Sequence, residues 1–179
     1  KDKNFMPPLP GKFAQTQEQN RFARQQLPTQ TTKPIRTSKI TVGILDFVNN
    51  SKNQQFNWLA TAIPNLVVEG MQVQNVVIKD RREVSEMSLL VAGNTANLTP
   101  EAASQIGILA NADLIITGYY EIINQRQIMI NYTIYHTDTR RVLTSNTLAG
   151  AVSQALNLIQ KTSVEITNFL DAYSKQRVK

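Results

Sequence analysis

The fold is decided by one apolar run near the start of the chain, KITVGILDF (residues 39–47). Its aliphatic and β-branched residues are bounded by polar turn formers, a pattern that predicts a β-strand. Apolar residues fill consecutive positions instead of alternating with polar ones, so we expect both faces of this strand to be covered. A strand of this kind is typical of a sheet with helices on its two sides.

The segment after this strand predicts a loop and then a helix. Residues 48–55 are rich in Asn and Gln and favour a loop. Apolar residues then recur at helical spacing over residues 56–71. Because proline is tolerated in the first turn of a helix but not deep inside it, Pro64 predicts that the helix begins near Ala62, after a short turn around Trp58.

The remaining segments complete an α/β order. Thr99-Pro100-Glu101 predicts a helix start, because the hydroxyl caps free amides, proline needs no amide partner, and the carboxylate favours the positive end of the helix dipole. Apolar residues alternate over residues 128–136, which predicts a strand with one buried face. The other expected elements are strands at residues 76–80, 112–123 and 142–148, and helices at residues 81–90 and beyond Gly150. The order β-α-β-α-α-β-β-β-α predicts an α/β sandwich with a mixed sheet flanked by helices.

Charge divides the chain into two regions. Residues 1–38 carry seven Lys or Arg and two acidic residues, a net charge of +5, which leaves +1 of the whole-chain +6 for residues 39–179. Five of the seven prolines also lie in residues 1–38, among runs of Gln and Thr that bury little apolar surface. The sequence therefore predicts an extended basic arm at residues 1–38 and an α/β domain at residues 39–179.

Aromatic and basic residues of the arm are candidate contacts with a partner. These candidates are Phe5, Phe13, Phe22, Arg21 and Arg24. Two interpretations stay open: the aromatic side chains pack back onto the body, or they dock into a partner. In the second case Phe13 and Phe22 are expected to contribute more affinity than Arg21 or Arg24, since buried aromatics dominate binding energy and exposed charges contribute little.

Sequence motifs of catalysis are not found. A Gly-x-Ser-x-Gly elbow, a phosphate-binding Gly-rich loop and a paired-histidine motif are absent, as is cysteine, and His136 is the only histidine. We therefore expect no catalytic residue, no metal site and no cofactor. Asp46, Asn49 and Asn50 are candidate ligand or partner residues, because sites in α/β sheets gather at strand ends. Asp46 is equally consistent with a structural acceptor for the Asn-rich loop.

The thin charge of the arm limits its partners. Seven cations in 38 residues make a weak electrostatic footprint, so we expect no nucleic-acid partner. The same charge suits loose attraction to anionic lipid headgroups or to cell-wall polymer. No stretch approaches the ~20 continuous apolar residues of a membrane helix. The chain opens with Lys1 rather than Met, so either a targeting segment has been removed or the chain has been trimmed, and a removed signal peptide is the commoner explanation.

Three segments together resemble an envelope-protein superfamily that includes the TolB amino-terminal domain, the curli secretion protein CsgG, lipoprotein activators of penicillin-binding proteins, and flagellar accessory proteins such as FlgO and FlgT. The first is ITVGILDFVNNS (residues 40–51), similar to the opening strand and Asn/Ser loop of the family. The second is VVIKDR (residues 76–81), similar to its second strand. The third, within residues 103–120, has the spacing G-x-x-x-x-A-D-x-x-x-x-G. The resemblance covers residues 39–170, nearly the whole body.

The resemblance implies a non-enzymatic periplasmic protein that binds envelope proteins and assembles or regulates an envelope machine, such as a flagellar accessory structure, a secretion complex or a cell-wall synthesis complex. It also implies a homo-oligomer or ring, near the outer membrane or cell wall. One departure is Thr139-Arg140, which stands where the family usually turns with Thr-Gly. The alternative is a periplasmic domain that senses a ligand or polysaccharide through the strand end near Asp46.

Overall fold

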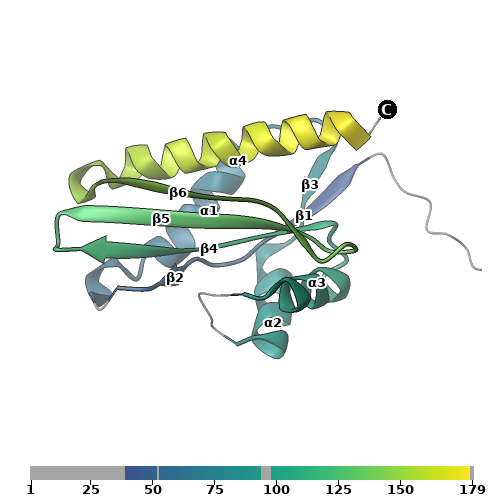
Figure 1. Cartoon of the computed structure of the whole chain (residues 1–179), viewed down its shortest axis with the longest axis horizontal. Helices are drawn as coiled ribbons and strands as arrows, with labels where there is room; N and C mark the ends of the chain where they lie inside the picture. The colour runs from purple at the N-terminus through teal and green to yellow at the C-terminus, as the bar shows by residue number, and fades with distance from the viewer. Residues whose placement is uncertain (1–38, 52, 94–97, 178–179) are drawn as a thin grey trace, which may run out of the picture. The chain divides into compact units, whose positions relative to one another are not determined.

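The computed structural model describes residues 39–51, 53–93 and 98–177. The expected partner contacts of residues 1–38 lie outside this part of the chain. Within it, six strands form one mixed sheet with the strand order β3-β1-β4-β5-β6, and β2 pairs with β4 (Figure 1). The strands are β1 (Ile40–Ile44), β2 (Val48–Asn49), β3 (Val76–Ile78), β4 (Leu114–Ile123), β5 (Gln127–His136) and β6 (Arg141–Ala151). The helices are α1 (Leu59–Gly70), α2 (Arg81–Val91), α3 (Pro100–Leu109) and α4 (Ala155–Arg177), with short 3-10 turns at Gln54–Phe56 and Val152–Gln154.

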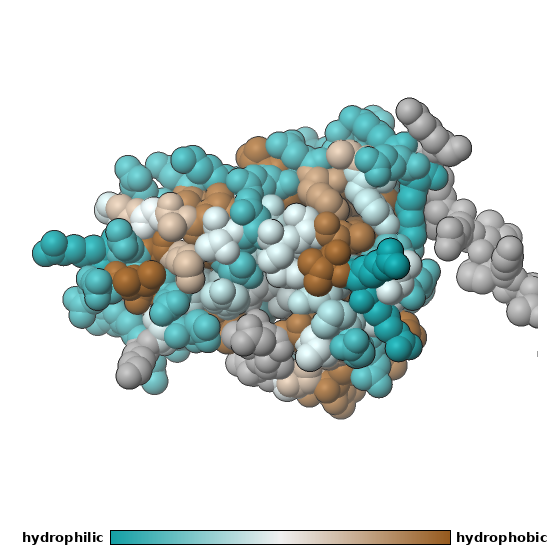
Figure 2. All heavy atoms as spheres, viewed as in Figure 1, coloured by the Kyte–Doolittle hydropathy of each residue, from teal (hydrophilic) through white to brown (hydrophobic). Residues whose placement is uncertain are grey.

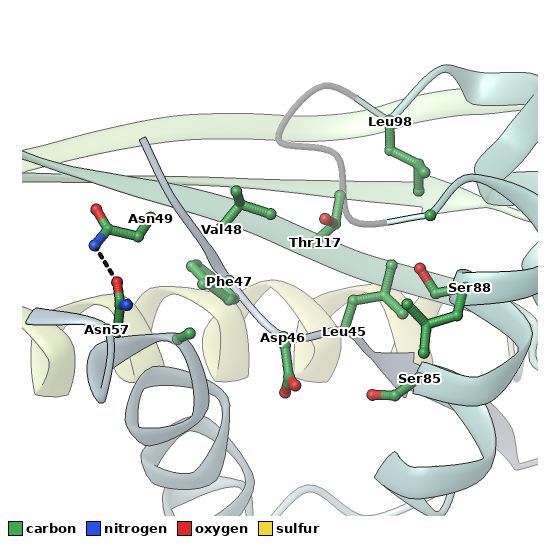
Figure 3. Close-up of a pocket in the computed structure, with 13 residues that line it drawn as sticks. Leu45, Asp46, Phe47, Val48, Asn49, Asn57, Ser85, Ser88, Leu98 and Thr117 are labelled. Atoms are coloured by element: carbon green, nitrogen blue, oxygen red, sulfur yellow. Dashed lines mark hydrogen bonds between the residues drawn. The ribbon is translucent and has the colours of Figure 1, made fainter. Parts of the chain in front are cut away.

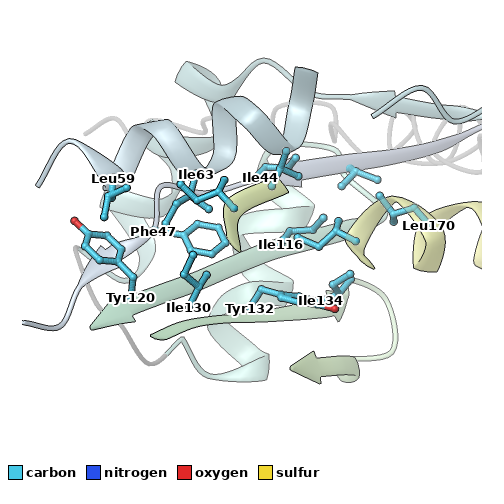
Figure 4. Close-up of a cluster of buried hydrophobic side chains, with 14 of the residues drawn as sticks. Ile44, Phe47, Leu59, Ile63, Ile116, Tyr120, Ile130, Tyr132, Ile134 and Leu170 are labelled. Carbon is cyan, nitrogen blue, oxygen red and sulfur yellow. The ribbon is translucent and has the colours of Figure 1, made fainter. Parts of the chain in front are cut away.

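Helices cover the two faces of the sheet, as the sequence predicts. β1 pairs in parallel with β3 and β4, whereas β4, β5 and β6 form an antiparallel meander. One apolar cluster joins α1 and α4 to one face of the sheet, and a smaller one joins α2 and α3 to the other. Figure 4 shows Phe47, Tyr120 and Ile130 meeting in the larger cluster. Four of the five residues of β1 are buried, so the expected central strand is confirmed.

The spaced Gly, Asp and Gly of the resemblance each have a structural reason. A Cβ on Gly107 of α3 would overlap the side chain of Thr137, and a Cβ on Gly118 of β4 would overlap the Asn131 carbonyl oxygen and the Phe47 ring. Asp113 accepts hydrogen bonds from the backbone N–H and the hydroxyl of Thr41, each at 2.8 Å. The motif therefore fixes how α3, β1 and β5 approach β4.

The expected start of the first helix is wrong, and the reason involves Pro64. α1 begins at Leu59 rather than near Ala62, so Pro64 lies inside the helix. Proline cannot donate the bond that would end on the carbonyl oxygen four residues earlier. That oxygen, on Ala60, instead accepts the backbone N–H of Phe47 at 2.9 Å. The missing helical bond is thus replaced by one that holds the segment after β1 against α1.

Other boundaries also differ from expectation, and two of the differences come from tertiary pairing. Residues 48–55 were expected to form a loop, but Val48–Asn49 is a short strand that pairs in parallel with Tyr119 and Tyr120. β6 continues to Ala151, three residues beyond the expected end, because it pairs with β5 along its whole length. Asn is a weak strand former, so Asn49 of β2 lies in the sheet because of its tertiary pairing with β4.

The turn that departs from the family pattern keeps a glycine-like backbone. Arg140, between β5 and β6, has φ +53°, in the left-handed region that glycine adopts without strain. Arginine therefore occupies a turn position whose backbone conformation suits glycine best.

Candidate partner pocket beside helix α2

A pocket of about 410 Å³ opens where the chain leaves β1 and passes α2 (Figure 3). β1 is followed by α1 on one face of the sheet, whereas β3 is followed by α2 on the other. Crevices form at such points, where the connections after neighbouring strands part. The pocket is lined by Leu45, Asp46, Phe47, Val48, Asn49, Asn57, Ala60, Ser85, Ser88, Leu89, Gly93, Leu98 and Thr117.

The backbone after β1 is held by three different partners in succession. The N–H of Leu45 donates to Ile116 of β4 at 2.9 Å, the N–H of Phe47 donates to Ala60 of α1 at 2.9 Å, and the N–H of Asn50 donates to Tyr120 at 2.8 Å. The backbone therefore bonds first to β4, then to α1 and then to β4 again. Asp46 lies between the first two of these bonds, and its side chain is exposed at the rim of the pocket.

The carboxylate of Asp46 pairs with Arg81 at the start of α2. The same guanidinium donates to the Asn65 side chain of α1. Arg81 therefore links the segment after β1 to both flanking helices. The expectation that Asp46 serves as an acceptor for the Asn-rich loop is not met, since its partner belongs to α2.

The other two candidate residues, Asn49 and Asn50, have different roles. The side-chain NH2 of Asn49 donates to the Asn57 side chain at 2.7 Å and to the Asn53 backbone oxygen at 3.1 Å, and the Asn49 side-chain oxygen Oδ1 accepts the N–H of Ser51 at 2.9 Å. These bonds occupy the amide of Asn49 in shaping the loop. Asn50 joins the ladder to Tyr120 through its backbone and exposes its side chain, and it does not line the pocket.

The opposite wall of the pocket was not anticipated from the sequence. Ser85, Ser88 and Leu89 of α2 and Thr117 of β4 supply hydroxyl groups and apolar surface. Thr117 is the single hydroxyl residue in the run LIIT at residues 114–117. That isolated hydroxyl within a buried strand, together with the leucine pair at residues 89–90 on a short helix, is the signal that could have indicated this wall.

Two leucines at the end of α2 are largely exposed. Leu89 is 64% exposed and Leu90 is 78% exposed, although both are large apolar side chains. Leu89 also lines the pocket. Since the hydrophobic effect disfavours such exposure, a partner that covers them would gain binding energy.

The opposite end of β1 holds a closed polar network instead of a pocket. Arg177 of α4 contacts Asp113 at 3.2 Å and His136 Nε2 at 3.3 Å, and its guanidinium lies 5.8 Å from the centre of the Tyr173 ring. Burial alone would raise the pKa of Asp113, but the bonds from Thr41 and the Arg177 guanidinium more than offset this and hold that pKa below its ordinary value. His136 is buried and accepts the Thr139 N–H at 3.3 Å, which fits a turn residue.

Residues 39–51, 53–93 and 98–177 contain no group of three or more His, Cys, Asp or Glu that is placed to hold a metal ion. Across those residues, no helix combines the length and the apolar composition required to cross a membrane.

Burial raises the pKa of Tyr120 to about 12, and its hydroxyl donates to the Phe56 carbonyl oxygen at 2.8 Å, so it supports the loop next to the pocket.

Comparison with known proteins gives a likeness of fold. No family model matches the chain, and no curated protein matches its sequence. The hypothetical protein CT253 from Chlamydia trachomatis superposes with a TM-score of 0.50 at 13% identity, over 77% of this chain and 99% of that one. Lipoprotein GNA1162 from Neisseria meningitidis gives 0.49 at 11% identity over 72% and 96%, and the LpoB C-terminal domain from Salmonella enterica gives 0.48 at 11% over 64% and 84%. The match to CT253 shows that the body of this chain shares that fold, and it shows the fold alone.

Proposed function

We propose that this protein is a non-enzymatic periplasmic interaction protein that assembles or regulates a bacterial envelope machine through its α/β body and its amino-terminal arm. The observation that carries the proposal is the exposed pair Leu89 and Leu90 on α2 beside the pocket after β1. The segments that resemble envelope proteins support the compartment and the class of partner. The arm supplies a second contact through Phe13 and Phe22.

The chemistry of the pocket suits a protein partner. Its apolar wall, formed with Leu45, Leu89 and Leu98, can receive an aliphatic or aromatic side chain. The hydroxyls of Ser85 and Ser88 can bond to the polar backbone that accompanies such a side chain. An anchor residue in a small pocket, surrounded by hydrogen-bonding groups, is the usual form of an interaction hot spot.

A photoreactive benzoylphenylalanine placed at Leu90 tests this in cells that produce the full chain. The expected result is one reproducible crosslink to an envelope protein. The matched control places the same residue at Ile108 on α3, which is 62% exposed and does not line the pocket. Equal crosslinking from both positions, or crosslinks only within the chain, would remove the proposal. A homo-oligomer or ring, which the resemblance implies, would appear in this experiment as a crosslink to a second copy.

A second candidate function is ligand or polysaccharide sensing in the periplasm. The pocket volume of about 410 Å³ lies in the range of small-molecule sites, and hydroxyl and amide groups line it. In this case a soluble cell-wall sugar fragment would raise the melting temperature of the protein, and Asp46→Ala would abolish that rise. Stabilisation that persists in Asp46→Ala would argue against a ligand held at this rim.

A further inference from the structure

The two edges of the sheet are built very differently. β3 forms one edge with three residues, Val76–Ile78. β6 forms the other with eleven residues, Arg141–Ala151, and none of them is buried. In the described part of the chain no strand pairs with the outer side of β6. This outer side, which we term the β6 edge, therefore presents a long row of backbone N–H and C=O groups to solvent.

The β6 edge lacks the features that usually prevent strand pairing. Residues 142–151, VLTSNTLAGA, contain no proline and no charged residue. The one register shift with β5 occurs at Ile134/Tyr135, and the pairing from Thr144 to Ala151 is regular. Natural proteins protect edge strands by bulges, prolines, charges or short length. An edge that keeps eight regular, uncharged residues is open to a further strand.

Helix α4 forms a wall beside this edge. Glu165 of α4 accepts a hydrogen bond from the Asn146 side chain of β6 at 2.7 Å, which holds one side of the helix next to the strand. This side of the helix, which we term the α4 stripe, lines a shallow hollow with Gln154, Asn157, Gln160, Lys161, Val164 and Glu165. Figure 1 shows α4 running along β6, and Figure 2 shows pale side chains of near-neutral hydropathy across the middle of the same view. An edge strand next to a helix is a geometry that accepts an extended peptide.

The net charge around the edge is positive. Arg141 begins β6, Lys161 lies on the α4 stripe, and Arg126 lies at the other end, where its carbonyl oxygen accepts the N–H of Val152 at 2.8 Å. None of these three cations forms an ion pair within the described residues. The carboxylate of Glu165, which accepts hydrogen bonds from the neutral groups of Tyr132 and Asn146, keeps its negative charge. Three cations against this carboxylate leave the edge with a net positive charge.

We propose that the β6 edge binds an extended acidic segment of a partner protein, which adds to the sheet as a strand alongside β6. Backbone hydrogen bonds to β6 supply affinity, and Lys161, Arg141 and Arg126 select for acidic side chains. The arm of this chain carries +5 and has the wrong sign for this site. A second copy of β6 would bring the same cations to the same edge. This site is separate from the pocket and goes beyond the proposed function.

The test uses the full chain and a synthetic peptide of about ten residues that alternates valine and glutamate, a length suited to strand addition. Fluorescence anisotropy of the labelled peptide measures affinity, and hydrogen exchange measures protection of amides in residues 144–151. The expected result is binding with new protection in those residues. Lys161→Glu is expected to weaken binding about fivefold, the effect of about 1 kcal/mol from one charge contact. Lys79→Glu, the same charge change beyond the opposite edge, is the matched control and is expected to leave affinity unchanged.

Three outcomes would overturn the proposal. The first is absence of protection in residues 144–151 when the peptide binds. The second is equal binding by a peptide with N-methylated backbone amides or with lysine in place of glutamate, since neither can satisfy both requirements of the site. The third is protection of β6 that rises with protein concentration without peptide, which would identify a second copy as the occupant. Leu89→Glu is expected to leave peptide affinity unchanged, so failure here and failure of the pocket proposal are distinguishable.

Discussion

Two aspartates near opposite ends of β1 each face an arginine, yet they belong to different kinds of structure. The Asp113 carboxylate accepts two bonds from Thr41 as well as contacting Arg177, and its side chain is 31% exposed. The Asp46 side chain is 45% exposed and pairs with Arg81 at the rim of an open pocket. The Asp113–Arg177 pair belongs to a hydrogen-bonded network where β1 and β4 begin, whereas the Asp46–Arg81 pair lies at the exposed rim of the pocket. The chain thus separates the residues that hold it together from those available to a partner.

The largest effect expected on the closed side of this comparison comes from Gly118→Ala. The added Cβ would overlap the Asn131 carbonyl oxygen and the Phe47 ring, and neither has room to move within the sheet and core. We expect a loss of about 3 kcal/mol in the free energy of unfolding, measured by urea denaturation. Gly150→Ala is the control, because its Cβ would meet Leu158 at an ordinary 3.5 Å. Similar losses for the two variants would contradict the packing at Gly118.

The two aspartates themselves give the next largest difference. Asp113→Ala leaves the Thr41 backbone N–H without its acceptor and removes the contact to Arg177, so we expect a loss of about 2 kcal/mol. Asp46→Ala removes a solvent-screened pair and is expected to cost about 0.5 kcal/mol or less. Urea denaturation of both variants measures the difference. If Asp46→Ala were the more destabilising change, the division between fold and surface would be wrong.

The pH dependence of stability gives a further test of the role of Asp113. The pKa of Asp113 is lowered in the folded protein, so its ionised form contributes stability above the unfolded pKa of about 3.9, and this is lost as pH falls through the folded value. We expect the stability difference between the natural chain and Asp113→Ala to shrink below about pH 4. Thermal unfolding between pH 6 and pH 2 measures it. A difference that stays constant over this range would mean that the Asp113 charge contributes nothing.

A smaller and stabilising effect is expected at the turn between β5 and β6. Arg140 has φ +53°, and replacing it with glycine removes the strain of a side chain in the left-handed region. We expect Arg140→Gly to raise the free energy of unfolding by about 1 kcal/mol. Arg141→Gly, at a position in β6, is the control and is expected to destabilise. A loss of stability in Arg140→Gly would show that its side chain has a structural role.

Local sequence patterns predicted the elements of the body well. The consecutive apolar residues of β1, the alternation along β5 and the cap at Thr99 each reflect a local rule, and the structure confirms all three. The start of α1 could not be predicted, because the helix tolerates Pro64 only through a bond from Phe47, which is distant along the chain. Strand β2 was missed for a similar reason, since its pairing with β4 is tertiary.

The candidate site could be predicted only in part. The strand-end rule indicated Asp46, and the structure places this residue at the pocket rim. The second wall comes from α2, whose outward leucines are indistinguishable in sequence from the buried apolar residues of any amphipathic helix. Partner contacts of Phe5, Phe13, Phe22, Arg21 and Arg24 lie outside the described residues and stay predictions.

The leucine surface of α2, formed by Leu89 and Leu90, is proposed to bind a partner and to be dispensable for folding. The most direct measurement is the yield of the crosslink from benzoylphenylalanine at Leu90 in a chain that also carries Leu89→Glu, compared with one that carries Leu156→Glu. Leu89→Glu is expected to abolish the crosslink, while the urea midpoint of both chains stays within error of the parent. A crosslink that survives Leu89→Glu undiminished, in a chain that remains folded, would show that the leucine surface does not bind the partner.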